Sequence, residues 1–119
     1  MELTTKRNYS AIGTTKQKPC EDGCPFRTIM NRLGDKWSVL IILILDEQPM
    51  LRFTELRDRI DGISLKVLAS CLKKLEKDSL VTRTSYDTVP PRVEYSLSAV
   101  GKKLVPFIRQ LSVWAMKNL

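Results

Sequence analysis

Histidine is absent from all 119 residues of the chain, and cysteine occurs only three times. Without imidazole, the chain lacks the commonest general base and the commonest metal ligand, and this absence argues against an enzyme. An odd and sparse set of cysteines argues against a secreted fold held by disulfides. The longest unbroken apolar run, Val39 to Leu45, is far shorter than the roughly 20 residues that a membrane helix needs.

Targeting and cofactor signals are also missing. The amino-terminal residues contain no apolar signal region, so we expect a cytoplasmic protein with no membrane partner. No glycine-rich phosphate loop occurs, and we expect no cofactor. Cys20 and Cys24 lie close together, but Cys71 is remote and no histidine can complete a tetrahedral metal site, so we expect no bound metal.

What is present is a single small domain with a basic balance. The chain is 43% apolar and 28% charged and carries a net charge of +7. Residues 24–62 hold six basic and six acidic side chains, whereas residues 63–79 hold four against two and residues 98–119 hold four against none. A localised basic excess indicates a nucleic-acid partner, and the alternative is simply a basic soluble surface.

The residue pattern divides the chain into an arm and a domain. Residues 1–23 have no apolar periodicity, and we expect a flexible or partner-ordered arm. Residues 24–119 should form one domain, mainly α with a small β-hairpin. The expected helices cover residues 25–33, 35–48 and 54–60, then a stretch from Ser64 to about residue 77, and finally a stretch from Ser98 to the end. Residues 39–45 could also be a buried strand, but their length and the flanking cap at Asp35 favour a buried helix.

The helices on either side of Gly62 predict a helix-turn-helix. In the second of them, Leu65, Leu68, Leu72 and Leu75 form the expected buried stripe. The opposite face carries Lys66, Ser70, Lys73 and Lys77, with Val67 and Lys74 beside them. Residues 80–86 and 92–97 are rich in β-forming side chains and flank a tip containing two prolines, which predicts a hairpin, the wing of a winged helix-turn-helix.

The last helix carries more apolar side chains than one small domain can cover. Phe107, Leu111 and Trp114 recur at helical spacing along it, and Pro106 should kink it. A homodimer joined through this helix is the economical way to cover that surface.

Taken together, these segments resemble the HxlR-type winged helix-turn-helix transcriptional regulators over roughly Cys24 to Trp114. Each segment alone is a weak pattern, but their order and spacing are specific. The matching segments are Cys24-Pro25, Gly34-Asp35-Lys36-Trp37, Arg52-Phe53-Thr54-Glu55-Leu56, Gly62-Ile63-Ser64-Leu65-Lys66-Val67-Leu68, Leu72-Lys73-Lys74-Leu75-Glu76 and Val89-Pro90-Pro91-Arg92-Val93-Glu94-Tyr95-Ser96-Leu97. This chain has Asp78-Ser79 after the second helix of the motif, where the family usually has Asp-Gly.

The resemblance implies a homodimer with the first and last helices at the interface. It also implies that the helix from Ser64 enters a major groove while the hairpin tip reaches the adjacent minor groove. We therefore expect a repressor that binds double-stranded DNA at a near-palindromic operator. The expected DNA contacts are Ser64, Lys66, Val67, Ser70, Lys73 and Lys74 on the helix and Arg92 on the wing. For Arg92 the alternative is an ion pair with Glu94 or Asp87.

Cys24 precedes the first helix, where unpaired N–H groups, the helix dipole and nearby Arg27 favour a thiolate. Some members of the resembled family sense oxidants or electrophiles through a cysteine at this place, so the resemblance implies a redox sensor with Cys20 as a candidate resolving partner. The alternative is a capping residue with no signalling role. Cys71 is interpreted as a packing residue.

Two other classes of function stay open at this point. A winged-helix module could use its basic helix to bind an acidic protein instead of DNA. An enzyme built around the Cys24 thiol would lack a histidine partner, which makes it the weaker alternative.

Overall fold

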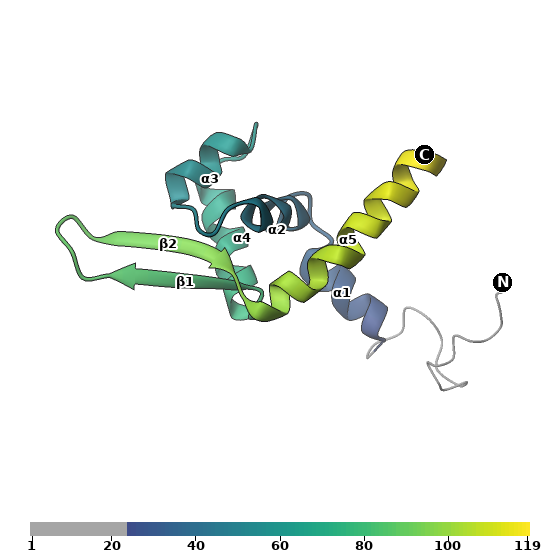
Figure 1. Cartoon of the computed structure of the whole chain (residues 1–119), viewed down its shortest axis with the longest axis horizontal. Helices are drawn as coiled ribbons and strands as arrows, with labels where there is room; N and C mark the ends of the chain where they lie inside the picture. The colour runs from purple at the N-terminus through teal and green to yellow at the C-terminus, as the bar shows by residue number, and fades with distance from the viewer. Residues whose placement is uncertain (1–23) are drawn as a thin grey trace. The chain divides into compact units, whose positions relative to one another are not determined.

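The computed structural model describes residues 24–119, so the expected arm of residues 1–23, including Cys20, lies outside the described residues. The elements follow the order α1 (Pro25–Leu33), α2 (Ser38–Glu47), α3 (Phe53–Arg59), α4 (Leu65–Lys77), β1 (Val81–Tyr86), β2 (Arg92–Leu97) and α5 (Ala99–Asn118) (Figure 1). The expected mainly α fold with one hairpin is confirmed, and residues 39–45 lie in a helix rather than a strand. None of the described helices is long and apolar enough to span a membrane.

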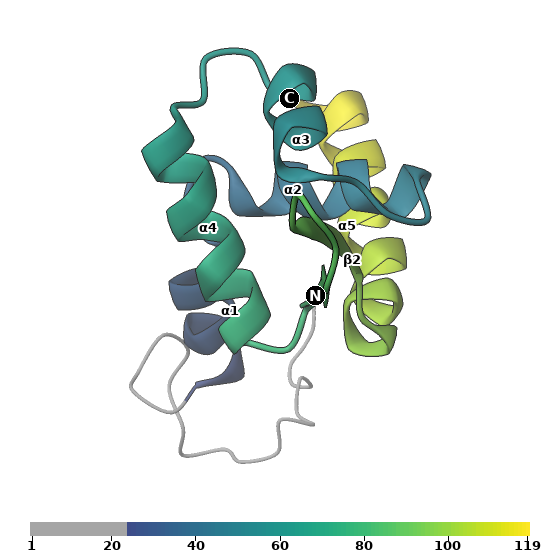
Figure 2. The same cartoon turned by 90° about the vertical axis from the view of Figure 1, so that its left-hand side faces the viewer.

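The chain forms two compact units divided between Asn31 and Arg32. In the second unit, α2 is the central element and packs against α3, α4, β2 and α5. Figure 2 shows it crossing behind α4 and α3. Ile41, Ile42 and Leu45 of α2 are almost fully buried, as are the leucines that α3 and α4 direct toward them. This apolar core holds the two helices of the helix-turn-helix.

Side-chain caps set where most of these helices begin. The Ser64 hydroxyl accepts from Val67 N at 3.1 Å, and the Ser98 hydroxyl accepts from Gly101 N at 2.9 Å, as expected. Asp35 also caps as expected, although α2 itself begins only at Ser38. The α3 helix begins one residue earlier than expected, and there the Glu55 carboxylate accepts from the Arg52 N–H at 2.8 Å.

The predicted buried stripe of α4 was wrong at one position. Leu65 is 52% exposed, because it lies in the first turn, before the part of α4 that packs on the core. Cys71 is buried with Leu68, Leu72 and Leu75, which confirms its interpretation as a packing residue.

The two strands pair antiparallel, from Val81 opposite Leu97 at the base to Tyr86 opposite Arg92 near the tip. Buried Val81 and Leu97 anchor the base, while the tip is exposed. Leu51 adds a short bridge to Tyr95, with N–H to O distances of 2.9 and 2.8 Å. The wing is therefore tied to the core at its base and free of packing at its end.

Candidate nucleic-acid interface

The outer face of α4 is polar and carries most of the expected DNA contacts. Lys66, Ser70 and Lys73 are exposed, and Val67 is half-buried. The Ser64 hydroxyl is engaged in capping the helix. Short and basic side chains on an exposed helix of this length fit the width of a B-DNA major groove.

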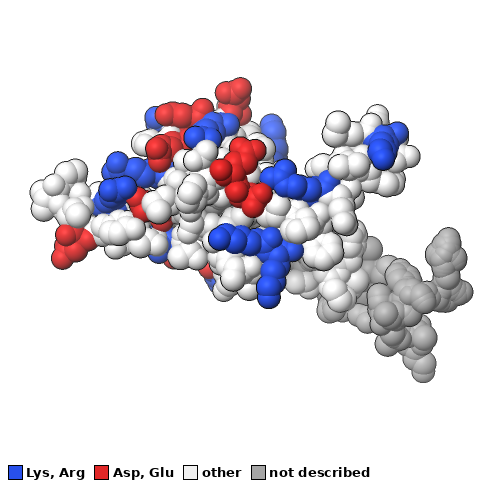
Figure 3. Space-filling model, in the orientation of Figure 1, with Lys and Arg blue, Asp and Glu red and all other residues white. Residues whose placement is uncertain are grey.

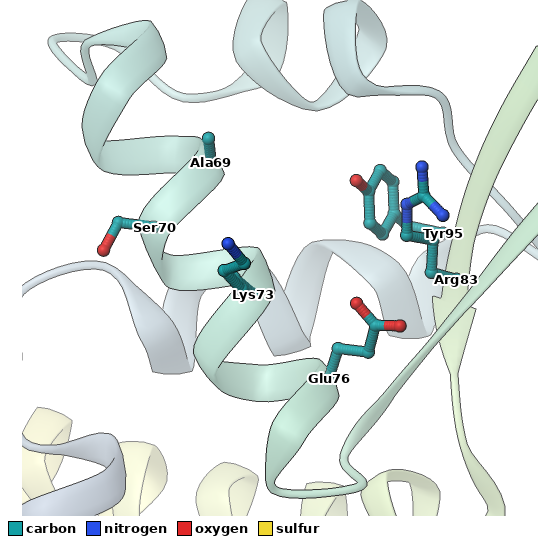
Figure 4. Close-up of a pocket in the computed structure, with 6 residues that line it drawn as sticks. All are labelled: Ala69, Ser70, Lys73, Glu76, Arg83 and Tyr95. Carbon is teal, nitrogen blue, oxygen red and sulfur yellow. The ribbon is translucent and has the colours of Figure 1, made fainter.

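A pocket of about 460 Å³ opens between α4 and the hairpin. Figure 4 shows Glu76 of α4 extending toward Arg83 and Tyr95 of the hairpin, with Lys73 beside the same opening. Ala69 and Ser70 complete the lining. The pocket thus combines two cations, one carboxylate and one phenol.

Arg83 and Tyr95 were not among the expected DNA contacts, although the sequence contains a signal for them. Arg83 lies two residues after buried Val81 and pairs with Tyr95 in the hairpin register. Because side chains alternate across a strand, both must share the face that includes Val81 and Leu97. If the alternation of side chains had been counted along the strand from Val81, it would have placed Arg83 on the face toward α4.

At the wing, the ion-pair alternative for Arg92 is what the structure shows. The guanidinium lies 2.6 Å from Oε2 of Glu94, whose side chain is only 5% exposed. The same guanidinium lies 5.7 Å from the centre of the Tyr86 ring. A hydrogen bond with Glu94 and the charge of that carboxylate raise the pKa of the Tyr86 hydroxyl. A role for Arg92 in a minor groove stays a prediction.

Lys74, an expected DNA contact, and Cys71, the expected packing residue, both have polar contacts inside the protein. Lys74 is half-buried, and its Nζ lies 3.0 Å from Oδ1 of Asp35. The Cys71 thiol lies 3.7 Å from Oδ2 of the same carboxylate. Burial first, and then the adjacent Asp35 charge, raises the pKa of the Cys71 thiol.

Cys24 is buried and immediately precedes α1. Its carbonyl oxygen accepts from the backbone N–H of Thr28 at 3.0 Å and from the Thr28 hydroxyl at 3.3 Å. The expected position of Cys24 at the helix start is confirmed. Its expected partner Cys20 lies outside the described residues.

The expected interface residues of α5 are exposed in the single chain. Phe107 and Leu111 are each about two-thirds exposed, and Trp114 is 54% exposed. Their spacing of four and three residues places them on one face of the helix. On α1, the apolar side chains Phe26, Ile29 and Met30 are exposed as well.

The surface charges are unevenly distributed. Figure 3 shows both signs intermingled over α2 and α3, with basic side chains gathered near the start of α5. Lys102 and Lys103 are exposed there. This matches the sequence, in which the carboxy-terminal stretch carries no acidic residue.

Comparison with known proteins identifies the family. The sequence profile of the HxlR-like helix-turn-helix family matches residues 32–119. The chain belongs to this family. The HxlR-like match covers α2 to α5 with the hairpin, and therefore every described element that lines the polar face of α4 and the pocket.

Several similar proteins carry the name of transcriptional regulator. An HTH-type transcriptional regulator of Halalkalibacterium halodurans, BH0655, is 44% identical over 94 residues, which are 79% of this chain and 83% of that protein. A crystal structure of a MarR-family transcriptional regulator from Porphyromonas gingivalis W83 superposes with a TM-score of 0.77 at 39% identity, covering 87% of this chain and all of that one. The redox regulator HypR in its reduced form gives a TM-score of 0.70 at 35% identity, covering 79% and 92%.

These similarities decide the class of function. Like its relatives, this HxlR-like protein is a winged helix-turn-helix transcriptional regulator that binds DNA. The names of these relatives are those of transcriptional regulators.

Proposed function

We propose that the protein is a repressor that binds a near-palindromic DNA operator as a homodimer, with α4 in the major groove and the wing tip in the adjacent minor groove. The observation that carries this proposal is the exposed polar face of α4 beside an exposed hairpin. Lys66, Val67 and Ser70 then face base edges, and Lys73 and Lys74 follow the backbone.

The pocket adds a path for the DNA backbone. One sugar-phosphate strand separates a major groove from the adjacent minor groove, so it must pass between α4 and the wing. Lys73 and Arg83 line the pocket at that place. We therefore add Arg83 to the proposed phosphate contacts, with Glu76 limiting how much negative charge the pocket accepts.

The exposed apolar face of α5 supports the homodimer. Phe107, Leu111 and Trp114 form a continuous strip that a second copy of α5 can cover. The exposed apolar side chains of α1 offer a second contributing surface. A twofold-symmetric dimer requires a site with twofold symmetry, with half-site centres about 10 base pairs apart or a multiple of that distance.

Selection of bound sequences from a random duplex pool, followed by titration against salt, tests the proposal. Lys73→Gln and Arg83→Gln should each weaken binding to operator and random duplex alike and reduce the slope of log affinity against log salt by about one per lost phosphate contact. Lys103→Gln, on exposed α5, is the matched control. Binding that ignores salt and both pocket variants would favour the alternative of an acidic protein partner.

A second proposed property is redox control through Cys24. It is supported by the cysteine's position at the start of α1 and by the similarity to the redox regulator HypR. Peroxide would convert the thiol to a sulfenic acid, with release of water, and α1 would shift as the added oxygen is accommodated. Operator affinity should fall after mild peroxide treatment of the wild type. An equal fall in Cys24→Ser would show that the sensor lies elsewhere.

A further inference from the structure

One carboxylate joins the start of the central helix to the DNA-facing helix. Asp35 lies in the turn before α2, and its Oδ2 accepts from the backbone N–H groups of Trp37 and Ser38, each at 3.0 Å. Its Oδ1 accepts from the Ser38 hydroxyl at 2.6 Å. These three contacts would by themselves be an ordinary helix cap.

Two further contacts to Asp35 come from α4, more than 35 residues along the chain. The Lys74 ammonium donates to Oδ1 at 3.0 Å, and the Cys71 thiol lies 3.7 Å from Oδ2. Residues three apart on a helix share one face, so Cys71 and Lys74 together direct that face of α4 toward the start of α2. Ser38 is fully buried at this junction.

The carboxylate is strongly held in its charged form. Burial alone would raise the pKa of Asp35. The hydrogen bonds from Ser38 and Lys74 and the backbone N–H groups of Trp37 and Ser38 outweigh burial and hold that pKa well below its usual range. The Asp35 carboxylate is therefore charged near neutral pH.

The remaining described contacts of α4 with the core are mainly apolar. Leu68, Leu72 and Leu75 are buried by the non-directional hydrophobic effect, which tolerates small rotations of the helix. Hydrogen bonds weaken steeply with angle and distance and so resist such rotations. Ser70 and Lys73 adjoin Cys71 and Lys74 in sequence, so the orientation of the DNA-facing side chains follows the orientation of this junction.

We propose that Asp35 is a positioning residue for DNA recognition, which acts through Lys74 and Cys71 to set the orientation of α4 in the major groove. This inference rests on the proposed function. For Lys74, it replaces the phosphate contact proposed above with a role inside the protein, while Lys73 keeps its proposed phosphate contact.

The test compares two aspartates with equal side-chain exposure. Asp35 and Asp46 are each 32% exposed, and each lies about 3 Å from a cation, Lys74 for Asp35 and Arg109 for Asp46. Asn caps helices about as well as Asp, so Asp35→Asn keeps the cap and removes the charge that holds Lys74. Asp46→Asn removes a comparable ion pair between α2 and α5, away from α4.

Operator affinity, random-duplex affinity and melting temperature are measured for the full chain. Asp35→Asn should weaken operator binding by about ten-fold while random-duplex binding changes less, so the ratio of the two falls. Because the lowered pKa of Asp35 contributes stability near neutral pH, the melting temperature of Asp35→Asn should fall, and the affinities are compared at a temperature at which every variant is folded. Asp46→Asn should leave the ratio unchanged.

Lys74→Met provides the second arm. If Lys74 acts through Asp35, this variant lowers the same ratio, and the double variant Asp35→Asn with Lys74→Met loses no more than either single variant. If Lys74 instead contacts a phosphate, Lys74→Met weakens binding to operator and random duplex alike and reduces the salt slope. Its effect then adds to that of Asp35→Asn, and this result overturns the inference.

The other outcomes also decide. An operator-to-random ratio unchanged within two-fold in Asp35→Asn overturns the positioning role while leaving the proposed function intact. A wild-type protein that shows no salt-dependent binding to any duplex overturns both.

Discussion

The Arg92 guanidinium lies 2.6 Å from the buried carboxylate of Glu94, two residues further along β2. Residues two apart share one face of a strand, and here the Glu94 side chain is buried while the Arg92 side chain is 52% exposed. The cation nearest the wing tip on β2 is therefore already paired with a carboxylate of the same strand.

Removing that carboxylate should release the cation for DNA. In Glu94→Gln, the Arg92 guanidinium loses its charged partner, so affinity for duplex DNA at low salt should rise and the slope of log affinity against log salt should steepen by up to about one per protomer. Arg92→Gln in the same titration gives the opposite change if the guanidinium reaches a phosphate. An unchanged slope in Glu94→Gln would show that Arg92 serves the hairpin alone.

Gly101 is required for the contact between α5 and the turn before β1. A Cβ at this position would lie 2.3 Å from the Leu80 carbonyl oxygen and 3.1 Å from Cδ2 of Leu97. Gly101→Ala should lower the free energy of unfolding by about 1–3 kcal/mol, measured by urea denaturation, because α5 must move off the hairpin base. Ser112→Ala, on the exposed part of α5, should change it by less than about 0.5 kcal/mol. Equal stability of the two variants would contradict the close approach.

Ser79 occupies a backbone conformation that suits glycine. Its φ is 65°, and it lies two residues after the end of α4. Ser79→Gly should raise the free energy of unfolding by about 0.5–1 kcal/mol. The free-energy cost of holding a serine at positive φ exceeds the cost of the larger conformational entropy that glycine gives the unfolded chain. Gly62, with φ of 85°, allows the reverse substitution as a control, and Gly62→Ala should lower the free energy of unfolding. A Ser79→Gly protein that melts below the wild type would argue against strain at this turn.

The acid stability of the protein should depend on Asp35. Because the pKa of Asp35 is lowered by its contacts in the folded chain, its contribution to stability is present above the ordinary carboxyl pKa of about 3.9 and is lost as the pH falls toward the folded value. Melting curves between pH 7 and pH 2 should therefore fall more steeply below pH 4 for the wild type than for Asp35→Asn. Parallel curves would show that other carboxylates account for the acid sensitivity.

Cys71 should resist alkylation in the folded protein. The residue is 8% exposed, and burial together with Asp35 raises the pKa of its thiol, which reduces the fraction of reactive thiolate near neutral pH. Mass spectrometry of iodoacetamide-treated protein should show slow labelling of Cys71 until urea unfolds the chain. Rapid labelling of Cys71 in the native protein would indicate that α4 opens readily.

Most elements were predictable because their signals are local. The helix from Ser64, the buried helix over residues 39–45 and the two strands follow from caps, breakers and periodicities that span only a few residues. Leu65 was assigned to the wrong environment, since periodicity alone cannot say where along a helix the core ends.

The sequence alone determined the winged helix-turn-helix, its basic outer face on α4 and the apolar strip Phe107, Leu111 and Trp114, because side-chain pattern specifies which face of an element is polar. Which charges of α4 face outward and which face inward follows from the packing of distant segments. Lys73 opens onto a pocket with Arg83, whereas the adjacent Lys74 pairs with Asp35. Two neighbouring lysines are equivalent in the sequence, and they differ here because Coulomb attraction and hydrogen bonding depend on which distant residues the packed core brings within about 3 Å of each ammonium.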